Sequence, residues 1–534
     1  MSCSSGLGGL VIQGKKREGS YLIKRELGYS SLFSYLLICI VACLLAISCT
    51  HKEQQPPVAT QPEQPAAAAT PESIPQPAPQ GQQSWADAVL YFAIVDRFAD
   101  GDSSNNRDVD ITQKGTFHGG DIKGLIRTLD QIAELGVTAI WITPVIKNID
   151  DFVTGAGFPD WGYHGYWADD FYKTDFRFGM EEDIKTLADE CHKRGIKLLL
   201  DVVYNHCGYD SQYTKNPATK NWLRTEQVGT CGQDDLTSCL SGLPDFKTEL
   251  PEVADYLMKA HLGMAKRTGI DGFRLDTVKH VDHPFWKEHR QRTRNELDKD
   301  FFLLGEVWGG DPKVLDEWFE GDEMDAGFDF SFQGSVTSFL LGRGRTIAFD
   351  RYLKTREQIR PGYLVSHFLS SHDVTGALKQ LDNNVDLFRL AAILQMTSAG
   401  IPMIYYGEEV ARPGGDWPDN RSDMPWGSMD ILPGKGKPRD EKLRADYIKL
   451  VHIRRAHLAL SRGAYGSISS EGDLLVFSRS HSENGDVVVV AVNRGTAPAN
   501  ASFALPAEWN GKQIKDVWNG EAATLNGTNI NMEL

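Results

Sequence analysis

The sequence carries little positive charge. Its 534 residues include 56 Lys and Arg against 72 Asp and Glu, which gives a formal net charge of −16. Nucleic acids and anionic lipid headgroups repel a chain with this excess of acidic groups. The charge balance therefore excludes nucleic acid as the main partner and leaves neutral ligands such as polysaccharides open.

Cysteine is also scarce, and half of it lies in the first fifty residues. Of the eight cysteines, Cys3, Cys39, Cys43 and Cys49 belong to that segment. If the chain is exported to an oxidising compartment, the remaining four can pair. Cys231 and Cys239 bracket a short polar loop, which predicts a disulfide, whereas Cys191 and Cys207 are expected to be free and buried.

Residues 1–49 read as a targeting segment. Basic residues from Lys15 to Arg25 precede the apolar run LFSYLLICIVACLLAIS, which ends at Cys49. This pattern resembles a bacterial lipoprotein signal, with Cys49 as the lipidated first residue of a membrane-anchored protein on the periplasmic side or the cell surface. A signal anchor, ordinary secretion and cleavage at Cys43 are the alternatives. Residues 50–84 are rich in Pro, Gln and Ala and are expected to form a tether.

After Trp85 the pattern alternates between strand and helix, as in parallel βα units. Eight apolar strand candidates separated by amphipathic helical stretches predict an α/β fold, a closed (β/α)8 barrel built from residues 85–206 and 251–460. The connection after the third strand, residues 207–250, is too long for an ordinary loop. Residues 461–534 show short strands and Asn-Gly turns, which predict a C-terminal antiparallel β-sandwich.

Acidic residues follow several of these strands. GFRLDTVKH ends its apolar run at Asp276, FFLLGEVW reaches Glu306, and YLVSHFLSSHD ends at His372 and Asp373. Barrel enzymes keep their reactive groups at the carboxyl ends of the strands, so these carboxylates are expected to share one site. Arg274 lies two residues before Asp276 and can form an ion pair with it. Apolar neighbours of Glu306, among them Trp308, are expected to raise its pKa.

Together with DVVYNH (201–206), LPDF (243–246) and YHGYW (163–167), these stretches resemble the conserved regions of the α-amylase family, glycoside hydrolase family 13. The resemblance covers roughly Val89 to the C-terminus. It implies that residues 207–250 form a small inserted domain, that Asp276 is the nucleophile and Glu306 the general acid/base, and that Asp373 stabilises the transition state. The substrate-binding residues that it implies are Tyr166, Trp167, His164, His206, Arg274, Lys279, His280, His372 and Arg421.

The resemblance also implies Ca²⁺, which requires six to eight oxygen ligands. A first site is expected from the loop after the first strand and the following segment: Asp100, Asp102, Asn105, Asn106, the Gly119 carbonyl and Asp121. A second site would use Asn205, the His280 carbonyl and an acid of the inserted segment, Asp234 or Asp235. A solvated acidic loop is the alternative to the first site.

The implied function is retaining endo-hydrolysis of α-1,4-glucosidic bonds in starch, glycogen or maltodextrins by a monomeric enzyme. Within the same family, the alternative is a maltodextrin- or cyclodextrin-processing hydrolase or a glucanotransferase. A remote alternative is an inactive glycan-binding lipoprotein, although the chain retains Asp276, Glu306 and Asp373.

Overall fold

The structure is a computed structural model that describes residues 84–498, 500–520, 522–524 and 527–533. The predicted signal segment with Cys49 and nearly all of the predicted tether lie outside the described residues. Within the described part, no helix combines the length and apolar character that a membrane crossing requires.

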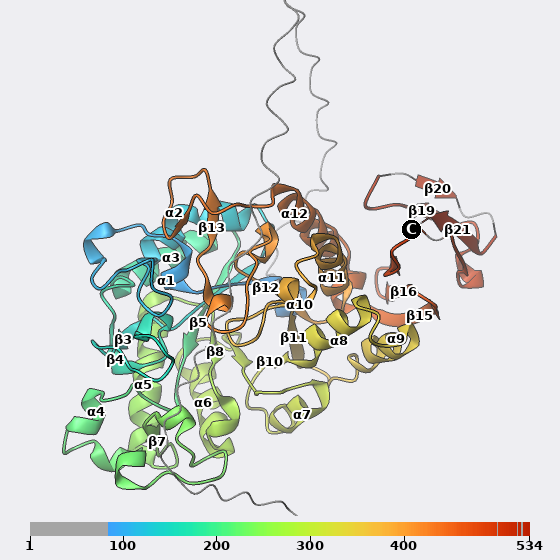
Figure 1. Ribbon diagram of the computed structural model, residues 1–534. Helices are drawn as coiled ribbons and strands as arrows, with labels where there is room; N and C mark the ends of the chain where they lie inside the picture. The colour runs from blue at the N-terminus through green and yellow to red at the C-terminus, as the bar shows by residue number, and fades with distance from the viewer. Residues whose placement is uncertain (1–83, 499, 521, 525–526, 534) are drawn as a thin grey trace, which may run out of the picture. The chain divides into compact units, whose positions relative to one another are not determined.

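Eight parallel strands close into a barrel, which confirms the predicted fold class (Figure 1). In barrel order each strand pairs with the next, and the last pairs with the first. The strands are β1 (Leu90–Ala93), β2 (Ala139–Ile142), β5 (Lys197–Val202), β8 (Gly272–Leu275), β9 (Phe302–Gly305), β10 (Ala326–Asp329), β11 (Leu364–Phe368) and β12 (Ile401–Tyr405).

The strands are short and apolar, and the barrel interior and the surrounding helices bury them from both sides. The helix α2 shows how the helices form: Ile122, Leu125, Leu129 and Ile132 lie on one buried face, and Asp121 caps the first turn by accepting from the Gly124 amide. The helices that follow or join the strands are α1 (Val95–Phe98), α2 (Ile122–Ala133), α3 (Glu181–Lys193), α5 (Pro251–Thr268), α6 (His283–Glu296), α7 (Pro312–Glu320), α8 (Ser331–Leu340), α9 (Thr346–Thr355), α10 (Ala377–Gln380), α11 (Val385–Thr397), α12 (Glu441–Ala456) and α13 (Leu458–Arg462).

Three longer connections extend from the carboxyl ends of the strands. The connection after β2 contains the antiparallel pair β3 (Ile146–Asn148) and β4 (Ala168–Thr174). The connection after β5 contains α4 (Gln212–Lys215) and the short pair β6 (Leu223–Arg224) and β7 (Asp245–Phe246). The connection after β12 contains β13 (Pro425–Gly427) and β14 (Gly434–Lys435).

The predicted disulfide joins Cys231 and Cys239 within the connection after β5. Cys191 and Cys207 are free and buried, as the sequence predicts.

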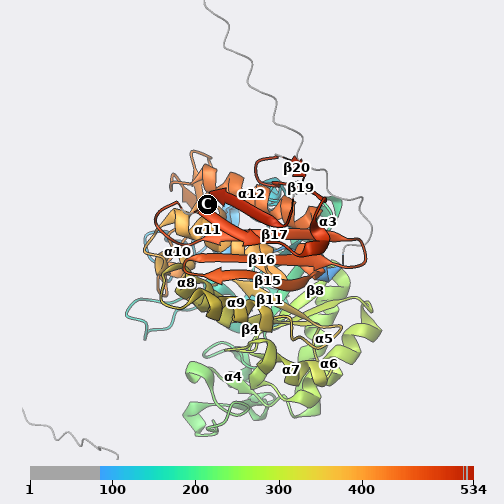
Figure 2. The same ribbon diagram turned by 90° about the vertical axis from the view of Figure 1, so that its right-hand side faces the viewer.

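Antiparallel strands make up the C-terminal part. Figure 2 shows β15 (Ala464–Glu471), β16 (Leu474–His481) and β17 (Asp486–Asn493) as one sheet. Smaller pairs follow, β18 (Asn500–Ala504) with β21 (Asn529–Glu533) and β19 (Gln513–Lys515) with β20 (Ala522–Thr524). Val476 of the sheet packs against Phe503 and Leu505 in a second, small core. Arg494 donates to the carbonyls of Phe339 and Gly344, which joins this part to the barrel helices.

Candidate active site

One buried guanidinium lies at the centre of the site. Arg274 on β8 is opposite Asp201 in the register of β5 and β8, and its Nη1 donates to Asp201 Oδ1 at 3.1 Å. The same nitrogen donates to Asp276 Oδ1 at 2.6 Å, and Nη2 lies 2.9 Å from Glu306 Oε1. Because strands β5, β8 and β9 are neighbours, residues distant in the chain share one cation at the carboxyl end of the barrel. The predicted ion pair of Arg274 and Asp276 is present.

The environment of Glu306 favours its protonated form. Burial raises the pKa of the Glu306 carboxyl to about 8, against the opposing effect of Arg274 and with the support of the negative charge on Asp276. The backbone N–H of Thr277, held at a φ of +50°, donates to Glu306 Oε2 at 3.0 Å and fixes its position. Trp308 differs from the prediction: it is 50% exposed and packs on Phe330, so it does not enclose Glu306.

Asp373 is held by Arg421, which comes from the connection after β12. Arg421 Nη2 donates to Asp373 Oδ1 at 3.0 Å, and its Nε donates to the His372 carbonyl at 2.9 Å. Burial opposes ionisation of Asp373, but the positive charges around it outweigh burial and hold its pKa below the ordinary value. The negative charge of Asp373, like that of Asp276, in turn raises the pKa of Glu306.

His372 and Tyr166 form a hydrogen-bond chain that leaves one acceptor free. The Tyr166 hydroxyl donates to Asp201 Oδ2 at 2.7 Å and is 2.8 Å from His372 Nε2, which must then carry the proton. Burial lowers the pKa of His372 to about 3, so the ring is neutral. Its Nδ1 is buried and has no partner within the described residues.

The remaining residues of YHGYW support Tyr166. His164 is buried, and its Nδ1 accepts from the Tyr166 amide at 3.1 Å. Trp167 is 8% exposed and packs with Ile149 and Leu243. The His164 ring stacks on Tyr166 with centroids 5.6 Å apart, and Trp167 packs edge-on against His164.

The other predicted binding residues follow β5 and β8. His206 is buried after β5, and burial lowers its pKa. Lys279 and His280 follow β8 and face the connection after β5: the Lys279 ammonium is 3.7 Å from Asp235 Oδ2, and His280 Nδ1 is 2.7 Å from the Asp235 carbonyl.

The predicted first calcium ligands lie together, and their donor set fits a cation. Asn106 Nδ2 donates to Asp100 Oδ2 at 2.7 Å, and Asn105 Nδ2 donates to Asp121 Oδ2 at 3.1 Å. The Oδ1 atoms of both asparagines are buried and have no partner within the described residues. Gly119 has a φ of +91°, and a Cβ there would approach Asn106 Oδ1 within 2.7 Å. Carboxylates and unsatisfied amide oxygens at one place are the ligands that Ca²⁺ prefers.

Asp102 of this set has other partners. Its carboxylate accepts from the Lys123 ammonium at 2.6 Å and from the Ser104 amide at 3.0 Å, and these hydrogen bonds lower its pKa to about 2. Asp100, Asn105, Asn106, Gly119 and Asp121 therefore fit a cation more directly than Asp102 does.

The predicted second calcium site requires a correction. The acid beside Asn205 is Asp245 of LPDF, whereas the Asp234 carboxylate is exposed and accepts from the amides of Leu236 and Thr237. With Nδ2 facing them, Asn205 donates to the His280 carbonyl at 2.9 Å and to Asp245 Oδ1 at 3.1 Å. Arg224 Nη1 donates to Asp245 Oδ2 at 2.8 Å. The groups that lie together here are therefore Asn205, the His280 carbonyl and Asp245, with Arg224 on Oδ2 of Asp245.

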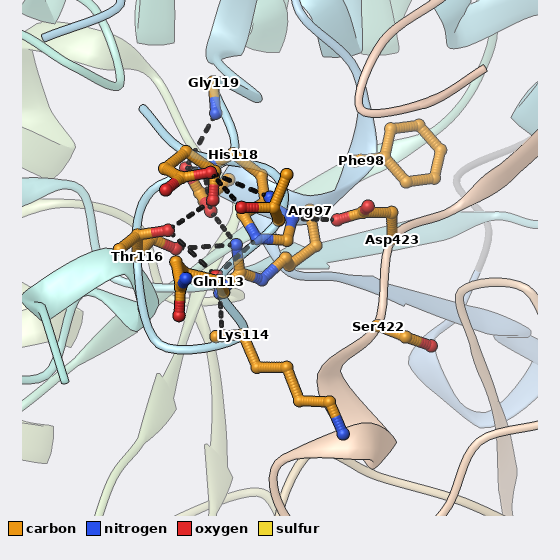
Figure 3. A network of polar contacts seen from close by, with 12 residues as sticks. Arg97, Phe98, Gln113, Lys114, Thr116, His118, Gly119, Ser422 and Asp423 are labelled. Atoms are coloured by element: carbon orange, nitrogen blue, oxygen red, sulfur yellow. Dashed lines mark hydrogen bonds and ion pairs between the residues drawn. The ribbon is translucent and has the colours of Figure 1, made fainter. Parts of the chain in front are cut away.

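Sequence reasoning missed a charged network behind the site (Figure 3). Arg97 Nη1 forms an ion pair with Asp96 at 2.7 Å, and the Arg97 guanidinium lies 3.7 Å from the Tyr163 ring centroid. His118 donates through its amide to Asp96 and contacts Asp423 through Nδ1. Its Nε2 is 3.0 Å from the Gln113 carbonyl, so both ring nitrogens face acceptors. This network joins the end of β1 to the connection that carries Arg421, and nothing in the local sequence pattern signals it.

The chain is similar to several known proteins. The family model "Alpha amylase, catalytic domain" matches residues 92–228 and 229–445. Neopullulanase 2 of Thermoactinomyces vulgaris is 32% identical over 439 residues, 77% of this chain and 70% of that protein. A cyclomaltodextrinase of a Bacillus species is 31% identical over 435 residues, 77% of this chain and 73% of that protein.

Among solved structures, an Anoxybacillus α-amylase superposes with a TM-score of 0.73 at 31% identity, and the match covers 85% of this chain and 96% of that one. The family-model match runs from within β1 into α12 and includes the strand ends described above. The chain therefore belongs to the α-amylase family, glycoside hydrolase family 13.

Proposed function

We propose that this enzyme hydrolyses α-1,4-glucosidic bonds in maltodextrins and cyclodextrins with retention of configuration. The observation that carries the proposal is the shared Arg274 guanidinium, which brings the Asp276 and Glu306 carboxyls together at one point. A nucleophile and a general acid in retaining glycosidases are separated by roughly 5 Å. The names of the relatives, neopullulanase and cyclomaltodextrinase, support short or cyclic glucans over starch as substrates.

The reaction proceeds in two displacements. An Asp276 oxygen attacks the anomeric carbon while the Glu306 carboxyl donates its proton to the leaving glycosidic oxygen, so a glycosyl ester forms and the acceptor end departs. Glu306, now a carboxylate, removes a proton from water, which attacks the same carbon and releases Asp276. Asp373 accepts hydrogen bonds from sugar hydroxyls, and the Tyr166 ring provides an apolar surface for the sugar.

Endo-acting α-amylase activity on starch is the second candidate. The similarity to the Anoxybacillus α-amylase, which extends over 96% of that chain, favours it. Both candidates use the same acids, so these residues do not distinguish them.

A product analysis tests the proposal. The purified protein is incubated with maltoheptaose, β-cyclodextrin and soluble starch, and the products are separated by chromatography while NMR follows the anomer released first. We expect α-anomers, and higher kcat/KM on the short or cyclic glucans than on starch. Initial β-anomers would refute retention, and a strong preference for starch with a broad range of oligosaccharides would favour the second candidate.

We further propose that one Ca²⁺ binds between the loop 100–106 and the segment 119–121, supported by the unsatisfied Asn105 and Asn106 oxygens. The ion would join the loop after β1 to the start of α2 through oxygen ligands. The lipid anchor through Cys49, the export of the protein and its monomeric state are also proposals, which rest on the sequence.

A further inference from the structure

Glu408 is a buried carboxyl group that the catalytic mechanism does not use. It lies in the turn η8 (Glu408–Val410) shortly after β12, and only 4% of the residue is exposed. Its Oε2 accepts from the Tyr405 amide at 3.0 Å, whereas its Oε1 is buried and has no hydrogen-bond partner within the described residues. A buried oxygen without a donor is unfavourable, which indicates that the carboxyl group carries a proton of its own or meets a donor from outside the chain.

Glu408 lines a small cavity together with Asn420 of the connection after β12. The cavity leaves about 10 Å³ for the centre of a water molecule, which is room for about one. Leu378 and Phe388 form part of its apolar wall. The Oδ1 atom of Asn420 is buried and, like Glu408 Oε1, has no partner within the described residues. A proton on Glu408 would therefore provide the donor that both oxygens lack.

The surroundings of Glu408 favour that proton. Burial raises the pKa of the Glu408 carboxyl to about 8, and the negative charge of Glu409 adds to this rise. The Ser370 hydroxyl, the Tyr405 amide and the charge of Arg412 oppose it. The Nε and Nη1 atoms of Arg412 donate to backbone carbonyls. The Glu408 carboxyl is therefore mostly neutral at pH 7.

Asn420 connects this cavity to the segment that carries Asp373. Its Nδ2 donates to the carbonyls of His372 and Val374, at 2.8 and 3.2 Å, on either side of Asp373. The next residue, Arg421, holds the Asp373 carboxylate itself. Because both carbonyls require the amide nitrogen, the orientation of the Asn420 amide is fixed, and Oδ1 is the atom left without a donor.

We propose that Glu408 is a positioning residue for Asp373. The protonated carboxyl of Glu408 donates to Asn420 Oδ1, directly or through one water in the cavity, and so keeps the Asn420 amide against the backbone on both sides of Asp373. Glu408 touches no substrate and transfers no proton in the reaction. This inference rests on the proposed glucan hydrolysis and adds to it a residue that determines where the transition-state stabiliser lies.

A pair of alanine variants tests this role. Glu408→Ala removes the donor, whereas Glu409→Ala removes the neighbouring buried carboxyl of the same turn, which accepts from the Tyr91 hydroxyl. We expect Glu408→Ala to lower kcat on maltoheptaose about tenfold or more and to change KM less than about threefold, because Asp373 acts mainly in the transition state. Glu409→Ala should keep the parent kcat, although both variants should melt at lower temperatures than the parent.

The conservative variant Glu408→Gln keeps a neutral donor. Its amide nitrogen can donate to Asn420 Oδ1 and its amide oxygen can accept from the Tyr405 amide, so kcat at pH 7 should match that of the parent. Gln cannot ionise, so kcat should fall less in this variant than in the parent between about pH 7 and pH 9. The charge of Glu408 also acts on Tyr447 of α12, but burial raises the pKa of that hydroxyl well above its ordinary value, so Tyr447 stays neutral in this range.

The outcomes separate positioning from a purely structural role. A parent-like kcat in folded Glu408→Ala, or an equal loss of kcat in Glu409→Ala, would overturn the proposal. If Glu408→Ala does not fold, Glu408→Gln decides. A full kcat at pH 7 with a smaller alkaline loss would support the role, and a low kcat at pH 7 or an unchanged alkaline loss would overturn it.

Failure of the proposed function has a different outcome. If the parent cleaves no α-glucan, calorimetric titration with acarbose, an inhibitor with an unsaturated ring that resembles the transition state, replaces the rate measurement. Weaker binding to Glu408→Ala than to both the parent and Glu409→Ala would then support the positioning role. Equal binding to all three, or no binding by the parent, would overturn it.

Discussion

Replacement of Glu306 by Gln should abolish activity and stabilise the protein. The substitution keeps the shape of the side chain, and the amide oxygen can still accept from the Thr277 amide or from Arg274. It removes the proton donor, and loss of general acid catalysis costs roughly 10²–10⁴-fold in rate. We expect kcat on maltodextrins to fall by at least that factor.

The gain in stability follows from the pKa of Glu306, which burial raises from 4.5 in the unfolded chain to about 8. Below pH 4.5 both states hold the proton, so the carboxyl contributes no penalty. Between pH 4.5 and 8 the unfolded state ionises while the folded state does not, and the penalty at pH 7 reaches about 3 kcal/mol. Gln cannot ionise, so the variant should unfold at higher urea concentration at pH 7.

Urea unfolding at pH 7 and at pH 4, followed by circular dichroism, measures this effect. The difference between the variant and the parent should be large at pH 7 and close to zero at pH 4. Equal or lower stability of the variant at pH 7, or the same gain at both pH values, would refute the protonation state assigned to Glu306. An active variant would refute its role as the acid.

Further predictions concern the groups around the site. Burial would raise the pKa of Asp423, but its contact with His118 lowers that pKa to about 2 from the ordinary 3.8. Asp423→Asn should therefore lower the free energy of unfolding by about 2 kcal/mol at pH 7. Urea unfolding should show this loss shrinking as the pH falls from 4 toward 2. Asp201→Asn removes one negative charge beside Arg274, so the pKa of Glu306 should fall and the alkaline limb of the kcat profile should move to lower pH; an unmoved limb would contradict the shared guanidinium. Elemental analysis should find at least one Ca²⁺ per chain, and chelation should lower the melting temperature, whereas a metal-free protein with an unchanged melting temperature would contradict the proposed site. In a bacterial host, Cys49→Ser should move the protein from the membrane fraction to the soluble fraction, which immunoblotting detects.

The barrel could be predicted because its strands and helices have local patterns. Apolar runs such as FFLLG are buried on both sides, and α2 repeats its buried residues at helical spacing, so each element is encoded in adjacent residues. Element ends are less predictable: the apolar spacing of ADYIKLVHIRRAHLAL (445–460) predicts one helix, but the structure has an interruption at His457 between α12 and α13. A break of this kind depends on packing against other elements, which adjacent residues do not reveal.

Residues of the site could be predicted only where they belong to a sequence motif. Asp276, Glu306 and Asp373 come directly after apolar strands, and the structure brings them into contact with Arg274 or Arg421. The prediction that Asp234 or Asp235 faces Asn205 was wrong. These two acids are adjacent in the sequence and were therefore candidates, whereas Asp245 contacts Asn205 through long-range contacts that the sequence does not show. Glu408 has the same character, since its lack of a partner for Oε1 is visible only in three dimensions.

The charges of the site explain why it holds a proton at neutral pH. Asp201, Asp276, Glu306 and Asp373 are four carboxyl groups near two guanidinium groups, Arg274 and Arg421, and burial keeps His372 neutral. Full ionisation would leave an excess of negative charge in a buried place, so at least one carboxyl retains its proton. Asp201 accepts from Arg274, the Trp141 indole and the Tyr166 hydroxyl, three donors that favour its ionised form even though burial raises its pKa to about 7. Glu306 has fewer donors and the higher pKa, which makes it the group that holds the proton and gives it to the leaving oxygen.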